Sequence, residues 1–172
     1  MNNILRAFKA MAGSAAVLAI AMGVVMASKP VATAQLAAPE LGSLHIARLV
    51  DLIGLIADER ETYAPLNTEL LTRWDAVPKD LVADGKLVSA WGGEVRAAPF
   101  NTENTLARLH LSAVPRTICV ELSFLLLDQS RVAGLYINSD QIDIEPENFG
   151  AMMLELGRLC PDDPSEIDVI IR

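Results

Sequence analysis

Few residues in this chain could perform catalytic or metal-binding chemistry. The histidines are His45 and His110, and the cysteines are Cys119 and Cys160. His45 has no second metal ligand at helical spacing, and we expect it at a surface or an interface. No serine–histidine–aspartate or cysteine–histidine arrangement is convincing with so few partners. We therefore expect no enzyme, no catalytic residue, no cofactor and no bound metal.

The other residues with chemical potential favour the same conclusion. Carboxylates occur in short runs, which are usually solvated faces: Asp58 with Glu59 and Glu61, Asp143 with Glu145 and Glu147, and Asp162 with Asp163. The Gly92-Gly93 pair lacks the following lysine and serine or threonine of a phosphate-binding loop. These patterns predict exposed surface and a turn.

The N-terminal segment is directed to a membrane. Arg6 and Lys9 precede an uncharged apolar run over residues 11–27, which Ser28-Lys29-Pro30 ends. No face of this run is polar, so a buried core helix fits it poorly. The pattern predicts an export signal or a signal anchor.

Two cleavage sites remain open on the sequence alone. Cleavage after Ala34, within a small-x-small pattern, would release a soluble protein that begins at Gln35. Cleavage after Gly13 would keep the apolar run on a mature chain that begins at Ser14. The second option divides the chain into a leader (1–13), a hydrophobic helix and membrane anchor (14–38) and a globular domain (39–172).

Export bears on the two cysteines, because it takes the chain into an oxidising compartment. The alternative to a bridge is two unpaired buried thiols in a cytosolic protein. A Cys119–Cys160 disulfide would close a loop of about 42 residues, worth about 4 kcal/mol in the chain-entropy model.

The charge balance argues against a nucleic-acid partner. The chain has a formal net charge of −8, and the part after Lys29 carries 11 cations against 22 anions. Phosphate backbones repel so acidic a surface.

The hydrophobic periodicity predicts an α+β fold led by a long helix. A helix is expected from Pro39 to about Thr62, with a buried stripe that Leu44, Leu52 and Leu55 widen enough for a second packing partner. The stripe comprises Ile46, Leu49, Val50, Ile53, Ile56 and Ala57. Shorter helices are expected at 68–74, 77–82 (ended by Gly85), 115–127 and 148–159. Strands are expected at 86–91, 94–96 (after a Gly92-Gly93 turn), 107–112, 135–137, 142–144 and 167–171.

On the strand at 107–112, His110 falls on the polar side beside Arg108, and we expect it to be solvated.

The order of these pieces resembles that of a known family. The motifs that carry the resemblance are Ala90-Trp91-Gly92-Gly93-Glu94-Val95, Ala113-Val114-Pro115, and Cys119 with a partner cysteine near the end. Together they resemble the type IVb major pilins, the PilS-like branch in particular. The resemblance implies a long N-terminal helix packed on an antiparallel β-sheet closed by one disulfide.

The resemblance also implies a function. Such subunits are cut by a prepilin peptidase, sit in the inner membrane and then stack their N-terminal helices into a cell-surface filament with other pilin subunits. They serve adhesion, aggregation or conjugative mating. Cleavage after Gly13 would let one helix run from Ser14 through Thr62, close to the family's helix length.

One position departs from the family pattern. Family members usually carry a glutamate five residues into the mature chain, where this chain has Leu18. That glutamate pairs with the N-terminal amine of a neighbouring subunit, and an unpaired buried ammonium is costly. A minor, tip or initiator subunit would account for Leu18. So would a soluble pilin-like binding module, cut after Ala34 by signal peptidase and found in the periplasm or secreted.

Overall fold

A computed structural model describes residues 38–142 and 149–172 of the chain. The chain divides into two units, Met1–Gln35 and Leu36–Arg172, and all that follows concerns the second. The predicted leader, the apolar run, Leu18 and both cleavage sites lie outside the described residues. So does the predicted acidic cluster at Asp143, Glu145 and Glu147.

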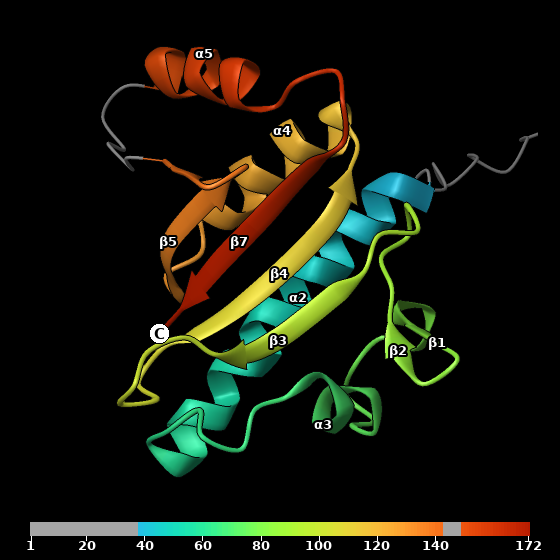
Figure 1. Ribbon diagram of the computed structural model, residues 1–172, viewed down its shortest axis with the longest axis vertical. Helices are drawn as coiled ribbons and strands as arrows, with labels where there is room; N and C mark the ends of the chain where they lie inside the picture. Colours follow the sequence, from blue (N-terminus) through green and yellow to red (C-terminus); the bar gives the residue numbers. More distant parts are fainter. Residues whose placement is uncertain (1–37, 143–148) are drawn as a thin grey trace, which may run out of the picture. The chain divides into compact units, whose positions relative to one another are not determined.

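An antiparallel sheet forms the centre of the described unit. Its strand order is β3–β4–β7–β5–β6: β3 (Val95–Pro99), β4 (Ala107–Val114), β7 (Ser165–Ile171), β5 (Val132–Ile137) and β6 (Asp140–Gln141). The last strand of the chain, β7, therefore lies in the middle and pairs with β4 and β5 (Figure 1).

Buried and exposed side chains alternate along β4, the longest strand of this sheet. Ala107, Leu109 and Leu111 are fully buried, whereas Arg108 between them points to the exposed face of the sheet. The predicted strand is confirmed and runs on to Val114 after a shift in register. Ala113 marks this bulge with a φ of 52°.

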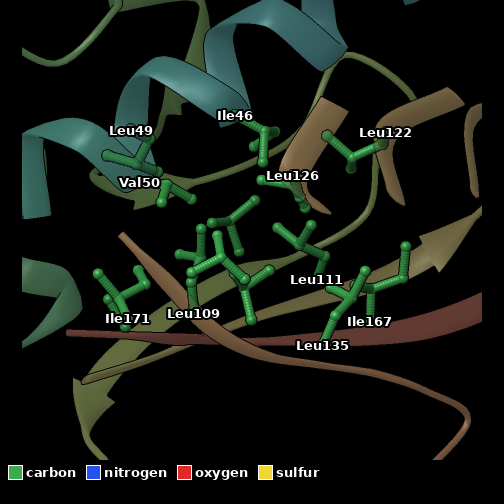
Figure 2. Close-up of a cluster of buried hydrophobic side chains, with 14 of the residues drawn as sticks. Ile46, Leu49, Val50, Leu109, Leu111, Leu122, Leu126, Leu135, Ile167 and Ile171 are labelled. Atoms are coloured by element: carbon green, nitrogen blue, oxygen red, sulfur yellow. The ribbon is translucent and has the colours of Figure 1, made fainter. Parts of the chain in front are cut away.

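Two helices cover one face of the sheet, α2 (Ala38–Arg60) and α4 (Arg116–Leu127), and both lie behind the strands in Figure 1. The inner face of α2 packs Ile46, Leu49 and Val50 into the core (Figure 2). Leucines and isoleucines from α4, β4, β5 and β7 meet them there: Leu109, Leu111, Leu122, Leu126, Leu135, Ile167 and Ile171. The predicted helix stripe is therefore confirmed as the core-facing side.

The connection between α4 and β5 holds α2 in place. Gln129 Nε2 donates to the carbonyl of Ala47 at 3.1 Å. Arg131 lies against Gly54, where an added Cβ would come within 2.4 Å of Arg131 Cδ. Its guanidinium donates to both carboxylate oxygens of Asp58, at 3.2 and 2.5 Å. These contacts join α2 to the C-terminal half of the chain.

The segment between α2 and β3 differs from the prediction. After α3 (Thr68–Thr72), only a 3-10 turn, η1 (Lys79–Leu81), replaces the helix expected at 77–82. Gly85 ends no helix. With a φ of 73°, it forms the turn of a small hairpin between β1 (Val82–Ala83) and β2 (Lys86–Leu87). The strand predicted at 86–91 thus stops at Leu87 and pairs backwards, because Asp84-Gly85 supplies the positive φ that a tight hairpin needs.

The remaining elements match with shifted ends. The long helix ends at Arg60, five residues before Pro65. The next residue, Glu61, has a φ of 57°, which ends the helical conformation. β6 pairs with β5 just before the strand expected at 142–144. Ile142 follows β6 as a buried residue, and 143 and 144 lie outside the described residues. The helix predicted at 148–159 is α5 (Phe149–Leu159).

Candidate functional site

The Trp91-Gly92-Gly93 motif forms a hydrogen-bonded turn. Gly92 has a φ of 85° and donates its N–H to the Ser89 carbonyl at 2.9 Å. Gly93 donates to Ser89 Oγ and accepts from the Ser89 N–H, both at 2.9 Å. An isolated bridge between Val88 and Glu94 closes it. The predicted turn is confirmed. On its N-terminal side, the strand expected to continue to Trp91 is reduced to this bridge at Val88.

The same motif lies between α2 and β4, and its backbone approaches both closely. We call this contact the Trp91 junction, formed by Gly42, Ala90, Trp91, Gly93 and Ser112. Trp91 Nε1 donates to the Ser112 carbonyl of β4 at 3.2 Å. A Cβ on Gly93 would lie 1.8 Å from that oxygen, and a Cβ on Gly42 of α2 would lie 2.6 Å from Ala90 Cβ. The motif therefore joins α2 to β4.

Pro115 marks the change from strand to helix. It precedes α4 with a φ of −63°, and its carbonyl accepts the Cys119 N–H at 2.8 Å. Because proline has no N–H, its place before the first helical turn leaves no donor without a partner. Pro115 therefore begins the helix that carries Cys119, a fully buried residue.

The two cysteines form the predicted disulfide. Cys119 and Cys160 are bonded with their Cα atoms 5.8 Å apart, and both are fully buried. The bridge joins α4 to the end of α5, so it ties one helix to another. Closing a loop of this length stabilises the fold by about 4 kcal/mol.

The outward face of α2 carries three exposed leucines. Leu41, Leu44 and Leu55 are 41%, 44% and 42% exposed. With Arg48 and Asp51, both exposed, they recur at steps of three and four residues along one line of the helix. We call Leu41, Leu44 and Leu55 the outer leucine line. Leu52 packs against the core instead.

Both histidines pair with aspartates. His45 Nδ1 lies 2.5 Å from Asp80 Oδ2, near the surface as expected. His110 Nδ1 lies 3.0 Å from Asp168 Oδ1, and its side chain is only 20% exposed. His110 lies on the polar face beside Arg108, as predicted, but it is less exposed than expected because it pairs with Asp168 of the neighbouring strand β7. Within 38–142 and 149–172, no three histidine, cysteine or acidic side chains gather as a metal site.

Asp58 and Tyr63 are among the groups whose pKa is shifted. Hydrogen bonds from Arg131 lower the pKa of Asp58. Burial raises the pKa of Tyr63, whose side chain is fully enclosed and whose hydroxyl finds no hydrogen-bond partner among the described residues.

Sequence reasoning missed a hollow on the exposed face of the sheet. We call it the outer hollow; it measures about 330 Å³ and is lined by Thr68, Arg96, Ala97, Ala98, Arg108, His110 and Asp168. These residues come from α3 and three strands, so no local spacing could have grouped them. Only the alternation in β4, which puts Arg108 and His110 on one face, was visible in the sequence.

These features define a class of fold. A long helix packed on an antiparallel sheet, with one disulfide between Cys119 and Cys160, is the type IV pilin fold. Within the described part of the chain, no helix is long and apolar enough to cross a membrane.

A comparison with solved structures names a particular neighbour. The chain is similar to a type IV b pilin from Salmonella typhi, with a TM-score of 0.57 and 15% identity over 76% of this chain and 97% of that chain. No protein-family model and no curated protein matches the chain. The resemblance found in the sequence is therefore confirmed at the level of the fold.

Proposed function

We propose that this chain is a structural subunit of a type IVb-like pilus, close to the PilS-like branch, which assembles through its N-terminal helix. The observation that carries the proposal is the outer leucine line on α2, a helix whose opposite side is already buried against the sheet. The similarity in fold to a type IV b pilin supports it.

The leucines suit packing between copies. Fully burying a leucine side chain stabilises a protein by about 1.5–3 kcal/mol. Each leucine of the line keeps roughly two fifths of its surface exposed, so a neighbouring helix would gain roughly 1 kcal/mol per leucine. Arg48 and Asp51 between them offer charges of both signs to a second copy.

The proposal also covers how the chain is processed and where it is located in the cell. Prepilin peptidase would cut after Gly13, and the apolar run that begins at Ser14 would hold the subunit in the inner membrane before it enters a surface filament. Adhesion, aggregation and conjugative mating are the roles such filaments serve. Leu18, in place of the usual glutamate, favours a minor, tip or initiator subunit. We expect no enzymatic activity.

N-terminal sequencing of the mature protein, together with recovery of sheared surface filaments, tests this function. We expect the mature chain to begin at Ser14. Leu44→Glu should lower recovery in filaments at least tenfold, because it buries a charge between helices. Leu154→Glu, at a 79% exposed leucine of α5, is the matched control. An equal loss in both variants, or in neither, would contradict the role of the outer leucine line.

A second candidate accounts for Leu18 without a special subunit. A soluble pilin-like binding module released by signal peptidase would begin at Gln35 and leave Leu18 behind. A mature N-terminus at Gln35, with monomeric protein in the periplasm or medium, would favour this function over the pilus subunit.

A further inference from the structure

The outer hollow lies on the face of the sheet that α2 and α4 leave open. In the register of the strands, Arg96 of β3 stands opposite His110 of β4, and His110 stands opposite Asp168 of β7. The three strands lie side by side in Figure 1. Arg108 lies two residues before His110 on the same face, diagonal to Arg96. The backbones of diagonal neighbours in a sheet lie about 7–8 Å apart, so the two arginines rise from the same face close to one another and both line the hollow.

The two arginines are only weakly engaged by protein groups. Arg96 pairs with Glu94 at 3.0 Å, but both side chains are more than half exposed, and such surface pairs contribute little. Arg108 Nε lies 3.9 Å from Asp168 Oδ1, beyond hydrogen-bond distance. A planar carboxylate can accept parallel hydrogen bonds from a guanidinium in a fixed geometry. Both arginines are therefore available to a ligand.

The other polar groups set the remaining chemistry of the hollow. Thr68 Oγ1 accepts the Ala97 N–H at 3.1 Å, which leaves its hydroxyl hydrogen free to donate. His110 Nδ1 donates to Asp168, because a carboxylate can only accept. Asp168 keeps a second carboxylate oxygen that can accept a hydroxyl donor. The hollow thus offers two cationic donors, a hydroxyl donor and one anionic acceptor.

We propose that the outer hollow binds a carboxylate-bearing sugar, with the carboxylate between Arg96 and Arg108 and sugar hydroxyls at Asp168 and Thr68. The volume of about 330 Å³ is at the small end of ligand sites and suits a single sugar unit. Asp168 distinguishes this ligand from a phosphate, because a doubly charged anion is repelled by the carboxylate whereas a sugar hydroxyl donates to it. The assignment does not depend on filament assembly.

Calorimetric titration of the purified full-length chain in detergent micelles tests the proposal. D-glucuronate is the probe, and D-glucose, acetate and inorganic phosphate are the comparisons. We expect saturable binding of glucuronate. Glucose, acetate and phosphate should each bind at least tenfold more weakly, since glucose lacks the carboxylate, acetate lacks the hydroxyls, and phosphate meets Asp168.

Matched variants locate the binding. Arg108→Gln should weaken glucuronate binding about tenfold or more, since it removes a charge-assisted hydrogen bond. Arg158→Gln removes an exposed arginine of α5 that pairs with Glu155 and should bind as the unaltered chain does. Circular dichroism and the melting temperature should show that both variants remain folded.

Several results would overturn the assignment. They are an absence of saturable glucuronate binding by the folded chain, equal binding of glucose or acetate, tighter binding of phosphate, or full binding by folded Arg108→Gln. If Arg108→Gln fails to fold, Arg96→Gln replaces it, with the same expected loss of glucuronate binding. The Arg96 side chain is 62% exposed, so this substitution should leave the fold intact.

Discussion

Gly93→Ala tests the Trp91 junction. An added Cβ would lie 1.8 Å from the Ser112 carbonyl oxygen, whereas ordinary contacts begin at 3.4 Å. The turn and β4 must therefore separate by about 1.6 Å. That movement breaks three hydrogen bonds that join the turn to β4: Trp91 Nε1 to the Ser112 carbonyl, the Glu94 N–H to Ser112 Oγ, and the Ser112 N–H to the Glu94 carbonyl. At about 1 kcal/mol for each hydrogen bond, we expect a loss of roughly 3 kcal/mol.

Two other glycines provide matched controls. Gly92 has a φ of 85° and open space around its Cβ position, so Gly92→Ala should cost only the left-handed backbone penalty of about 1–2 kcal/mol. Gly157 lies in α5 with no neighbour near its Cβ position, so Gly157→Ala should stabilise the fold by about 0.5–1 kcal/mol. The three substitutions add the same methyl group, and only the surroundings differ.

Guanidinium denaturation of the oxidised protein measures the three free energies of unfolding. Tryptophan fluorescence is a suitable probe, because Trp74 and Trp91 both pack against the core. The expected order of stability is Gly157→Ala above the unaltered chain, then Gly92→Ala, then Gly93→Ala. A smaller loss for Gly93→Ala than for Gly92→Ala would refute the close approach of this turn to β4.

Three further predictions follow from single contacts. Gly42→Ala should destabilise the fold because its Cβ would meet Ala90 Cβ at 2.6 Å, and adding Ala90→Gly should recover part of the loss in a double-mutant cycle. Tyr63→Phe should leave the free energy of unfolding nearly unchanged, because the hydroxyl has no partner among the described residues, whereas Tyr63→Ala should cost about 3–5 kcal/mol. The lowered pKa of Asp58 means that its pairing with Arg131 stabilises the fold above about pH 4 and is lost as pH falls through the lowered value. Asp58→Asn should therefore reduce stability at pH 7, and the difference from the unaltered chain should vanish in acid, as urea titrations at several pH values would show.

Local patterns predicted the long helix α2, the strand β4 and the disulfide well. The spacing of Ile46, Leu49 and Ile53 is a property of consecutive residues, so it identified the buried side of α2 without knowledge of its partner. The same holds for the alternation in β4. Two cysteines left one pairing to consider, and Cys119–Cys160 is bonded.

Contacts between distant segments could not be predicted in this way. The sequence carried no sign that Lys86–Leu87 pairs backwards with Val82–Ala83, since its apolar pattern also fits a strand that continues to Trp91. It placed His110 on a polar face but not beside Asp168, which lies 58 residues away. The outer hollow was missed for the same reason.

The sequence by itself determined the long helix and the strand that begins at Ala107, which sides of them are apolar, and that two cysteines allow one disulfide. The tertiary structure decided that the final strand lies between β4 and β5, that Gly93 lies against Ser112, and that Arg96, Arg108 and Asp168 share one face. The division has a physical cause. Periodicity and turn chemistry act over a few neighbouring residues, whereas strand order and the approach of backbones depend on how distant apolar faces are buried together.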